Sequence, residues 1–437
     1  MWGVTRLPWQ PVHSGLVVGE LKGEDAWYPL ITPLSLLKRL VILGPREARA
    51  SIACSLIQRC WPLGVRYLVL DTARLYRALL RHPKAKLYRL GYDTSFNPFR
   101  AEESWSDEEL HSYAQLVSKY FAFCFNLTRL HASLLCRALA RLYQEKPDPS
   151  AIEVLQAVEG EATPIARGQT LAEEVKLTLT SLLQGYAATC LLSQGPEPPL
   201  LDELGIVELS RLATYEVKAF IQACLAAKCL ISGLQPTLVI EDAHALFPRR
   251  RGLEAPELLS LDLTLLAPSQ ATLSEHVLGE ASLTLEATSS QGGWVRAKVS
   301  INGERLEARL EASSLEDLSD SDADALMEER LGRRPEKLKP VKARPLTTLE
   351  ELFPRDDVRR EVYAVLSYLR DNYSTFRALF ELMNLPSDVA RKALIKLHRH
   401  KVIAQSEVGG AKVVTLTDFG RLVLEEYESV VGGGNGG

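Results

Sequence analysis

Long apolar runs, the residue pattern of a signal peptide and an excess of positive charge are all absent from this sequence of 437 residues. No stretch approaches the roughly 18 apolar residues that a membrane-crossing helix requires, so we expect no membrane segment. The first residues, MWGVTRLPWQPVHSG, lack a charged region followed by an apolar core, so we expect no signal peptide. The formal net charge is −4. Nucleic-acid binding would therefore depend on a local basic patch and not on the charge of the whole chain.

Paired cysteines are also missing. The seven cysteines are scattered through apolar stretches, and no two of them form a C-x-x-C pair or a spacing typical of zinc ligands. Their odd number argues against a secreted disulfide framework, so we expect buried free thiols in a cytoplasmic protein. The hydrophobic share of 46% and the charged share of 24% are ordinary for a globular protein. The length suits about two to three domains.

The first part of the chain has the pattern of a doubly wound α/β unit. Short strands lead to KRLVILG, which ends at Gly44, and a helical run follows from Ser51 to Cys60. The next apolar run, GVRYLVLD, ends at Asp71. Strand, loop, helix and strand in this order are typical of a parallel sheet covered by helices. Similar apolar runs return in LGIVELS and TLVIED, which predicts further strands of the same sheet.

The remainder of the chain changes character several times. Residues 104–200 are rich in Leu and Ala at helical spacing and have no convincing strand, which predicts an all-helical insertion. A charged, proline-bearing stretch later in the chain indicates a linker that has room for one helix. The predicted parts are the first part of the α/β core (1–103), the insertion (104–200), the second part of the core (201–312), the charged linker (313–354), a compact C-terminal module (355–430) and a flexible tail (431–437).

The stretch VILGPREARAS matches half of a phosphate-binding loop. In the pattern G-x-x-x-x-G-K-[ST], Gly44 matches the first glycine and Ser51 the hydroxyl residue. Arg49, however, stands where a second glycine lets the backbone approach the phosphates, and Ala50 removes the lysine charge. Because arginine binds phosphate well, Arg46 or Arg49 is a candidate replacement for the missing cation.

The order of the motifs resembles the HerA/FtsK group of P-loop ATPases, especially its HerA-like and type IV secretion branch. The likeness covers about residues 16–312. It rests on GLVVGELKGEDAWYPL before the loop, LVLDTARLY, the N-P-F turn of YRLGYDTSFNPFR, the helix-leading LGIVELSRLATYEVKAFIQACL, VIEDAHALFP in place of V-I-D-E-A-H, and the sensor-like LTLLAPSQATLSEHVLGEASLTLEA. The resemblance implies a RecA-like core that assembles into a hexameric ring and moves nucleic acid with ATP and Mg²⁺.

Within this resemblance, the residues that hydrolysis needs are altered together. The family has Asp and then Glu at the Walker B position, whereas this chain has Glu241 and then Asp242. The resemblance assigns Mg²⁺ to Ser51 and Glu241, and it assigns the water-activating role to Asp242, one methylene shorter than the usual glutamate. Pro268 replaces the sensor glutamine, and ASLTLEA has no arginine to act as a finger. We therefore predict a pseudo-ATPase without a required cofactor. Binding of ATP and Mg²⁺ without turnover stays open.

The C-terminal module resembles a winged helix-turn-helix. Its pattern is three helices, a hairpin around Gly409 and Gly410, and a last helix. In such folds the third helix enters the major groove and the wing touches the backbone. The expected DNA contacts are Ser387, Arg391, Lys392, Lys396 and Arg399 on the third helix and Lys412 on the wing. Because the module as a whole is close to neutral, protein binding is the alternative.

Three functions agree with these observations. The first is a pseudo-ATPase that serves as a structural or regulatory DNA-binding subunit of a DNA translocation or processing assembly. The second is a working but divergent DNA-translocating ATPase in which arginine replaces the loop lysine. The third is a winged-helix DNA-binding regulator that keeps the ATPase fold as an oligomerisation scaffold. The expected partners are DNA and either further copies of the chain, as in a hexameric ring, or an active HerA-like ATPase.

Overall fold

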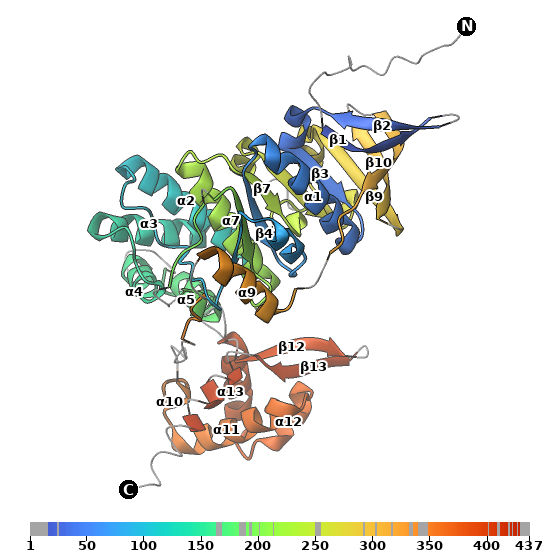
Figure 1. Cartoon of the computed structure of the whole chain (residues 1–437). Coiled ribbons are helices and arrows are strands. Elements are labelled where there is room, and N and C mark those ends of the chain that lie inside the picture. Colours follow the sequence, from blue (N-terminus) through green and yellow to red (C-terminus); the bar gives the residue numbers. More distant parts are fainter. Residues whose placement is uncertain are drawn as a thin grey trace.

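The computed structural model is that of an α/β protein with a separate C-terminal unit (Figure 1). It describes residues 16–23, 26–162, 168–182, 189–191, 195–200, 202–212, 214–249, 255–291, 293–301, 304–315, 318–331, 335–339, 348–400, 402–408, 411–417, 420–421, 423–425 and 427–428. The predicted tail lies outside these residues. In the part of the chain that is described, we find no helix with the length and apolar character that crossing a bilayer requires.

One large mixed sheet organises the first three quarters of the chain. Its order is β2-β1-β11-β10-β9-β3-β8-β7-β4-β6-β5. Strands β9, β3, β8, β7, β4, β6 and β5 are parallel neighbours, whereas β10, β11, β1 and β2 extend the sheet in antiparallel fashion. The strands are β1 (Leu16–Lys22), β2 (Trp27–Thr32), β3 (Arg39–Leu43), β4 (Tyr67–Asp71), β5 (Ala85–Arg89), β6 (Leu204–Glu208), β7 (Thr237–Ile240), β8 (Leu263–Ala267), β9 (Leu283–Gln291), β10 (Trp294–Ile301) and β11 (Glu304–Glu311).

The parallel strands are short continuous apolar runs because helices cover both of their faces. Every residue of β4, β6, β7 and β8 is buried. One face packs against α1 (Arg46–Cys60). The other packs against α2 (Asp107–Cys124) and α7 (Tyr215–Ile231). A strand with both faces buried does not alternate apolar and polar residues. Such runs are therefore recognised in the sequence by their length and their content of β-branched residues.

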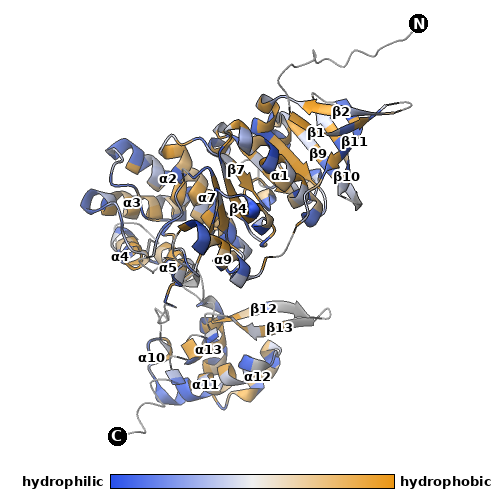
Figure 2. Ribbon diagram, viewed as in Figure 1, coloured by the Kyte–Doolittle hydropathy of each residue, from blue (hydrophilic) through white to orange (hydrophobic). Residues whose placement is uncertain are grey.

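The region expected to be an all-helical insertion contains α2 and then α3 (Arg129–Glu145), α4 (Ala151–Ala162) and α5 (Gly168–Leu182). The described part of residues 104–200 has no strand. Helix α2 begins at a capping box in which the Ser106 side chain accepts from the Glu109 amide and Glu109 accepts from the Ser106 amide. Helices α2 and α3 carry both hydrophobic and hydrophilic faces (Figure 2), as expected for helices that cover a core on one side.

The charged stretch expected to be a linker holds a helix, and this helix packs against the core. Helix α9 (Asp320–Leu331) buries Ala323 and Met327 against the α1 face of the sheet. The connection from β4 to β5 holds only a short 3-10 helix, η3 (Arg77–Arg81), so α9 covers part of a face that a longer crossover helix would otherwise cover. The acidic residues that suggested a solvated segment are ion-pair partners of buried arginines.

Two arginines bind α9 to the sheet. The Arg77 guanidinium donates to Glu208 at 2.7 Å and to Asp320 at 2.7 Å. Arg89 donates to Asp93 at 2.6 Å and also to Asp324. Both arginine side chains are fully buried. Buried charges are stable only when they are paired in this way, so α9 belongs to the fold of the core.

The C-terminal module has its own hydrophobic core. Its elements are α10 (Leu349–Leu352), α11 (Asp356–Asp371), α12 (Phe376–Leu382), α13 (Ser387–Arg399), β12 (Ile403–Val408) and β13 (Ala411–Leu416). Three helices followed by a hairpin are the arrangement that the sequence predicts. Leu349 and Leu352 of α10 are part of this core, so the module begins before the predicted start at residue 355.

Candidate functional site

The acidic and basic residues that the motifs singled out meet at one edge of the sheet. Gly44 follows β3, Asp71 ends β4 and Glu241 follows β7. Because these strands are parallel, their carboxyl ends lie at the same edge, and this edge is where α/β sheets bind ligands. Gly44, Asp71 and Glu241 therefore lie at one edge of the sheet.

The phosphate loop itself is absent as a loop. Strand β3 ends at Leu43 and α1 begins at Arg46, so only Gly44 and Pro45 connect them. Gly44 has a φ of +122°, and a Cβ there would lie 2.5 Å from the Ala287 carbonyl oxygen. Its amide faces the carbonyl oxygens of Ala267 and Pro268, each at 3.2 Å. The Gly44 amide therefore has its partners within the protein, and its Cα lies close against Ala287.

The remaining residues of the motif are helical. Arg46, Arg49, Ala50 and Ser51 all lie in the first two turns of α1. The Arg49 amide donates to the Pro45 carbonyl at 3.0 Å, as helix geometry requires. A phosphate cradle needs amides that point out of a loop. The gapless match to the loop pattern thus identified the right position in the fold but the wrong local conformation.

Arg49 fills the position next to the Walker B acids. Its Nη1 donates to the Gly44 carbonyl at 2.6 Å and its Nη2 to Glu241 Oε1 at 2.7 Å. Both side chains are buried. Tyr76 donates its hydroxyl to the other oxygen of Glu241 at 3.0 Å. Glu241 therefore has a partner on each oxygen without any bound ligand.

Arg46 forms the second pair, with Asp242. Its guanidinium donates to Asp242, which also accepts from the Thr72 hydroxyl at 2.8 Å. The Arg46 side chain is 43% exposed, so one side of this pair faces solvent. Asp242 has a φ of 57°, in the left-handed region. The two guanidinium groups thus contact both acids to which the family resemblance assigned Mg²⁺ and water activation.

The residues expected to bind Mg²⁺ do not fit that role. The Ser51 hydroxyl donates to the Ser313 carbonyl, and the Ser313 amide donates back to the Ser51 carbonyl at 3.2 Å. Glu241 is engaged by Arg49 and Tyr76, as described above. Across the described residues, no group of three or more His, Cys, Asp or Glu side chains is arranged to hold a metal ion. We therefore derive no chemistry through Mg²⁺ at this site.

Burial changes the protonation of the two carboxyl groups at the strand ends. It raises the pKa of Glu241 to about 7, although Arg49 and Tyr76 act in the opposite direction. It raises the pKa of Asp71 to about 6, although the amides of Ala73 and Tyr76 donate to that carboxylate. In both cases the cost of desolvating the charged form exceeds the effect of the partners.

Sequence reasoning missed several members of this site. Thr72 and Tyr76 lie in the LVLDTARLY stretch but were not assigned a role, and Ser313 belongs to no motif that the sequence shows. Pro45 is the N-cap of α1, but a Gly-Pro pair is as typical of a turn as of a helix start. The pairing of Arg49 with Glu241 joins residues far apart in the sequence, so only the fold reveals it.

The residues proposed to bind DNA differ in their exposure. Ser387, Arg391 and Lys392 are exposed on α13, and exposed Ile395 lies on the same stripe. Lys396, the fourth predicted contact on α13 that the structure describes, is half-buried. Its Nζ donates to the Leu352 carbonyl at 2.7 Å, at the end of α10, so it stabilises the module instead. The side chains of Arg399 and Lys412 lie outside the described part of the structure.

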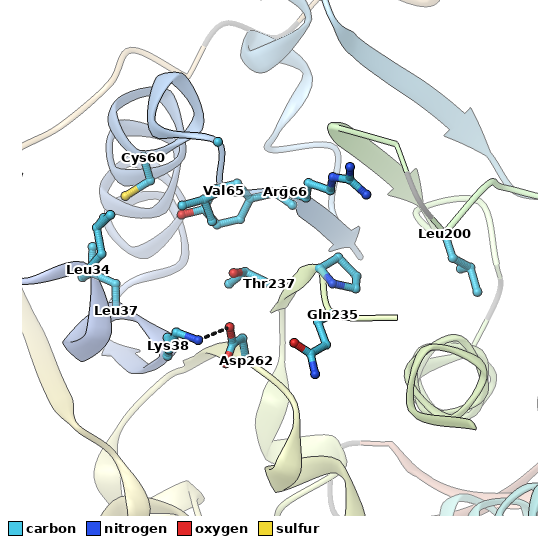
Figure 3. Close-up of a pocket in the computed structure, with 13 residues that line it drawn as sticks. Leu34, Leu37, Lys38, Cys60, Val65, Arg66, Leu200, Gln235, Thr237 and Asp262 are labelled. Carbon is cyan, nitrogen blue, oxygen red and sulfur yellow. Dashed lines mark ion pairs between the residues drawn. The ribbon is translucent and has the colours of Figure 1, made fainter. Parts of the chain in front are cut away.

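A cavity of about 460 Å³ lies away from this site, at the amino ends of the strands (Figure 3). Tyr67 and Thr237, the first residues of β4 and β7, line it. Lys38 and Asp262 form an ion pair in its wall at 3.3 Å. It contains none of the residues that the motifs indicated.

The architecture is an α/β fold with a large mixed sheet of the kind found in P-loop ATPases. It matches the structure of VirB4 from Thermoanaerobacter pseudethanolicus with a TM-score of 0.50 and 13% sequence identity, over 69% of this chain and 97% of that chain. At this identity the match shows a shared fold and nothing of activity.

Weaker matches come from the bacterial conjugative coupling protein TrwB. The sulphate-bound trigonal form of TrwBΔN70 has a TM-score of 0.46 and 11% identity, over 72% of this chain and 98% of that chain. TrwB in complex with ADP and Mg²⁺ has a TM-score of 0.42 and 12% identity, over 67% and 81%. No protein-family model and no curated protein matches the sequence.

The Arg49–Glu241 pair predicts a strong energetic coupling. Arg49→Met leaves Glu241 buried without its cation, so we expect a loss of about 3–5 kcal/mol in the free energy of unfolding. The double variant Arg49→Met, Glu241→Gln removes the charge as well and should lose less than the sum of the single variants. Urea unfolding of the four proteins measures the coupling. Additive losses would show that the pair does not exist in solution.

The pKa values predict how stability changes with pH. A carboxyl group whose pKa is raised on folding stabilises the folded state at low pH, and this contribution is lost as the pH rises through the folded pKa. For Glu241 the loss falls between about pH 4.5 and 7, and for Asp71 between about pH 3.8 and 6. Wild type should therefore lose stability relative to Glu241→Gln as the pH rises from about 5 to about 7.5, as measured by urea unfolding. A difference that is constant, or that moves the other way, contradicts the assignment.

Proposed function

We propose that this protein is a HerA/FtsK-type ATPase-fold subunit without ATP hydrolysis, which acts as a structural or regulatory DNA-binding component of a DNA translocation or processing assembly. The observation that carries the proposal is the buried contact of Arg49 with Glu241 and the Gly44 carbonyl. It places a protein cation where an active site would need an open phosphate cradle and a free acid.

Loss of hydrolysis follows from the chemistry of phosphoryl transfer. The reaction needs a loop cation on the β- and γ-phosphates, a metal held by the loop hydroxyl and an acid, and a group that orients water. Here the connecting loop is only Gly44 and Pro45, the Ser51 hydroxyl contacts Ser313, and Glu241 and Asp242 pair with arginines. Each requirement is unmet for a different physical reason, so a single substitution would not restore turnover.

The alternative of a working divergent ATPase receives less support from these contacts. For Arg46 or Arg49 to replace the lysine, the guanidinium would have to face bound phosphate. Arg49 is buried and directed at Glu241 and Gly44. Arg46 is partly exposed but pairs with Asp242. Both cations are therefore committed to acids of the same chain. Release of Arg49 would also leave Glu241 buried without its cation.

The DNA-binding part of the proposal rests on α13. Its exposed Ser387, Arg391 and Lys392 offer one hydroxyl and two cations on a helix that such modules place in the major groove. Ile395 on the same stripe suits contact with a thymine methyl group. Oligomerisation, either as a ring of identical chains or beside an active HerA-like ATPase, is part of the proposal that the fold resemblance suggests.

Hydrolysis is tested directly. Purified protein should show no Mg²⁺-dependent ATP turnover above background, with or without duplex DNA, and Glu241→Gln should leave that background unchanged. The double variant Arg49→Gly, Ala50→Lys should also remain inactive, because α1 still begins at Arg46. Steady turnover that disappears in Glu241→Gln would establish the divergent-ATPase alternative instead.

If α13 binds DNA, substitution of Lys392 and substitution of Lys396 should have different effects. Arg391→Ala, Lys392→Ala should weaken duplex binding by about tenfold or more and reduce the slope of log K against log salt by roughly 2. Lys396→Met should lower the thermal stability of the module but leave that slope unchanged, because its cation contacts Leu352. Fluorescence anisotropy over a salt series measures both. If the double variant binds duplex like wild type, α13 is not the DNA-binding helix.

A further inference from the structure

An exposed apolar patch lies at the antiparallel end of the large sheet. Strand β2 is the last strand at this end in the described part of the chain, and β1 is its neighbour (Figure 1). The exposed large apolar side chains on these two strands are Val17, Trp27, Tyr28 and Ile31, and we call them the β1–β2 patch. Val17 and Ile31 are each 43% exposed and lie directly opposite each other on the two strands. Contiguous apolar surface of this kind usually marks a place where another segment or protein binds.

Val17 and Ile31 lie on the face of the sheet opposite α1. Successive residues of a strand point to opposite faces. Val18 and Leu30 are buried in the hydrophobic cluster that includes α1, whereas their neighbours Val17 and Ile31 are exposed. Strand β10 alternates between buried and exposed residues in the same way. The antiparallel end of the sheet therefore has one face on the core and one open face, as is common for antiparallel strands.

The charged groups beside the patch are already paired. The Arg309 guanidinium lies over the rings of Trp27 and Trp294, 4.7 Å and 5.1 Å from their centroids. Arg309 also donates to the Glu20 carboxylate on β1. Because this cation has an acid and two aromatic rings as partners, it does not call for an anionic ligand. An apolar centre beside a paired polar rim is instead the composition of a surface that packs against protein.

The edge of β2 is poorly suited to an added strand. Pro29 lies within β2 and has no amide hydrogen. A strand that paired with β2 would lose a hydrogen bond at this point, and proline is one of the residues that protect sheet edges from such pairing. An occupant of the patch would therefore bind mainly through apolar side chains and not through a ladder of backbone hydrogen bonds.

Residues 1–15 are the occupant that the sequence itself offers. They lie outside the described part of the structure and lead directly into β1 at Leu16. Their sequence, MWGVTRLPWQPVHSG, has no acidic residue and carries several large apolar ones, which are Trp2, Val4, Leu7, Trp9 and Val12. Apolar side chains gain free energy when they leave water for an apolar surface. The patch is such a surface at the point where this segment enters the sheet.

The reach of this segment matches the length of the patch. Trp9 precedes Leu16 by seven positions, and an extended chain of that length spans at most roughly 25 Å. Strand β1 covers only about 17 Å from Val17 to Lys22, which pairs with Trp27. Trp9 can therefore reach every part of the patch, even with a turn before β1. Because segment and patch belong to one chain, their effective concentration is also high.

We propose that residues 1–15 bind the β1–β2 patch of the same chain, with Trp9 as the side chain that contacts it. The segment covers the open face at this end of the sheet, so the patch is not available to another chain while the segment is bound. Any contact between copies of the protein would then use other surfaces. This packing depends neither on the loss of hydrolysis nor on DNA binding by α13.

The experiment uses the full chain with the photo-crosslinking amino acid p-benzoylphenylalanine in place of Trp9. After irradiation, mass spectrometry identifies the residues joined to position 9, and denaturing gel electrophoresis separates crosslinks within a chain from those between chains. Ile31→Glu places a charge on the patch at an exposed position, where it should not disturb the core. Leu130→Glu is the matched control, because Leu130 is also an exposed apolar residue but lies on α3 in the helical insertion.

We expect crosslinks from position 9 to β1 or β2 of the same chain. Ile31→Glu should lower their yield by about tenfold or more, because a carboxylate without a partner is costly to cover with an apolar segment. Leu130→Glu should leave the yield unchanged.

Three results would overturn the proposal. The first is the absence of crosslinks to β1 and β2, whether position 9 reacts elsewhere or with nothing. The second is a yield that Ile31→Glu and Leu130→Glu affect equally. The third is a crosslink to β1 or β2 of another chain, which would assign the patch to residues 1–15 of a second copy.

Discussion

The buried contact between Arg49 and Glu241 is the interaction on which the rest of the site depends. Moving an arginine and a carboxylate out of water costs several kcal/mol per ion, and this cost is offset only when each group has close partners. Arg49 has the Gly44 carbonyl and Glu241, and Glu241 has Arg49 and Tyr76. The edge of the sheet is therefore complete without nucleotide. This edge of the sheet is closed by the protein's own side chains.

Buried arginines paired with carboxylates also occur at the neighbouring strands of the sheet. Arg77 and Arg89 are buried at the carboxyl side of the fold and are neutralised by Glu208 and Asp93 together with acids from α9. Because each arginine needs an acid from α9, the segment after the sheet cannot leave without exposing or orphaning a charge. Ion pairs with the buried arginines and the burial of Met327 thus keep α9 packed on the sheet. The separate hydrophobic core of the winged helix begins only after α9.

The sequence was informative where the signal is local and repetitive. Apolar runs such as those ending at Gly44, Asp71 and Glu241 predicted parallel strands, and their order predicted an ATPase-like sheet that the match to VirB4 supports at the level of fold. The contacts that distinguish this chain are not local. Arg49 and Glu241 are separated by 192 positions, so no pattern of spacing shows that they pair.

The same limitation explains the other differences. Asp320 and Asp324 look like a solvated charge run until the fold places Arg77 and Arg89 opposite them. Lys396 has the spacing of an exposed helical position, but its ammonium group donates a hydrogen bond to the Leu352 carbonyl at the end of α10. Pro45 is the N-cap of α1, and a Gly-Pro pair is as typical of a turn as of a helix start, so the helix at Arg46 had no clear local signal.

The most direct measurement of the central claim is a crystal structure of the protein grown with a non-hydrolysable ATP analogue and Mg²⁺. We predict that α1 begins at Arg46, that Arg49 contacts Glu241 and the Gly44 carbonyl, and that no nucleotide lies between β3 and α1. An analogue bound at Gly44, with Arg49 turned toward its phosphates and Glu241 free to hold a metal, would contradict this prediction.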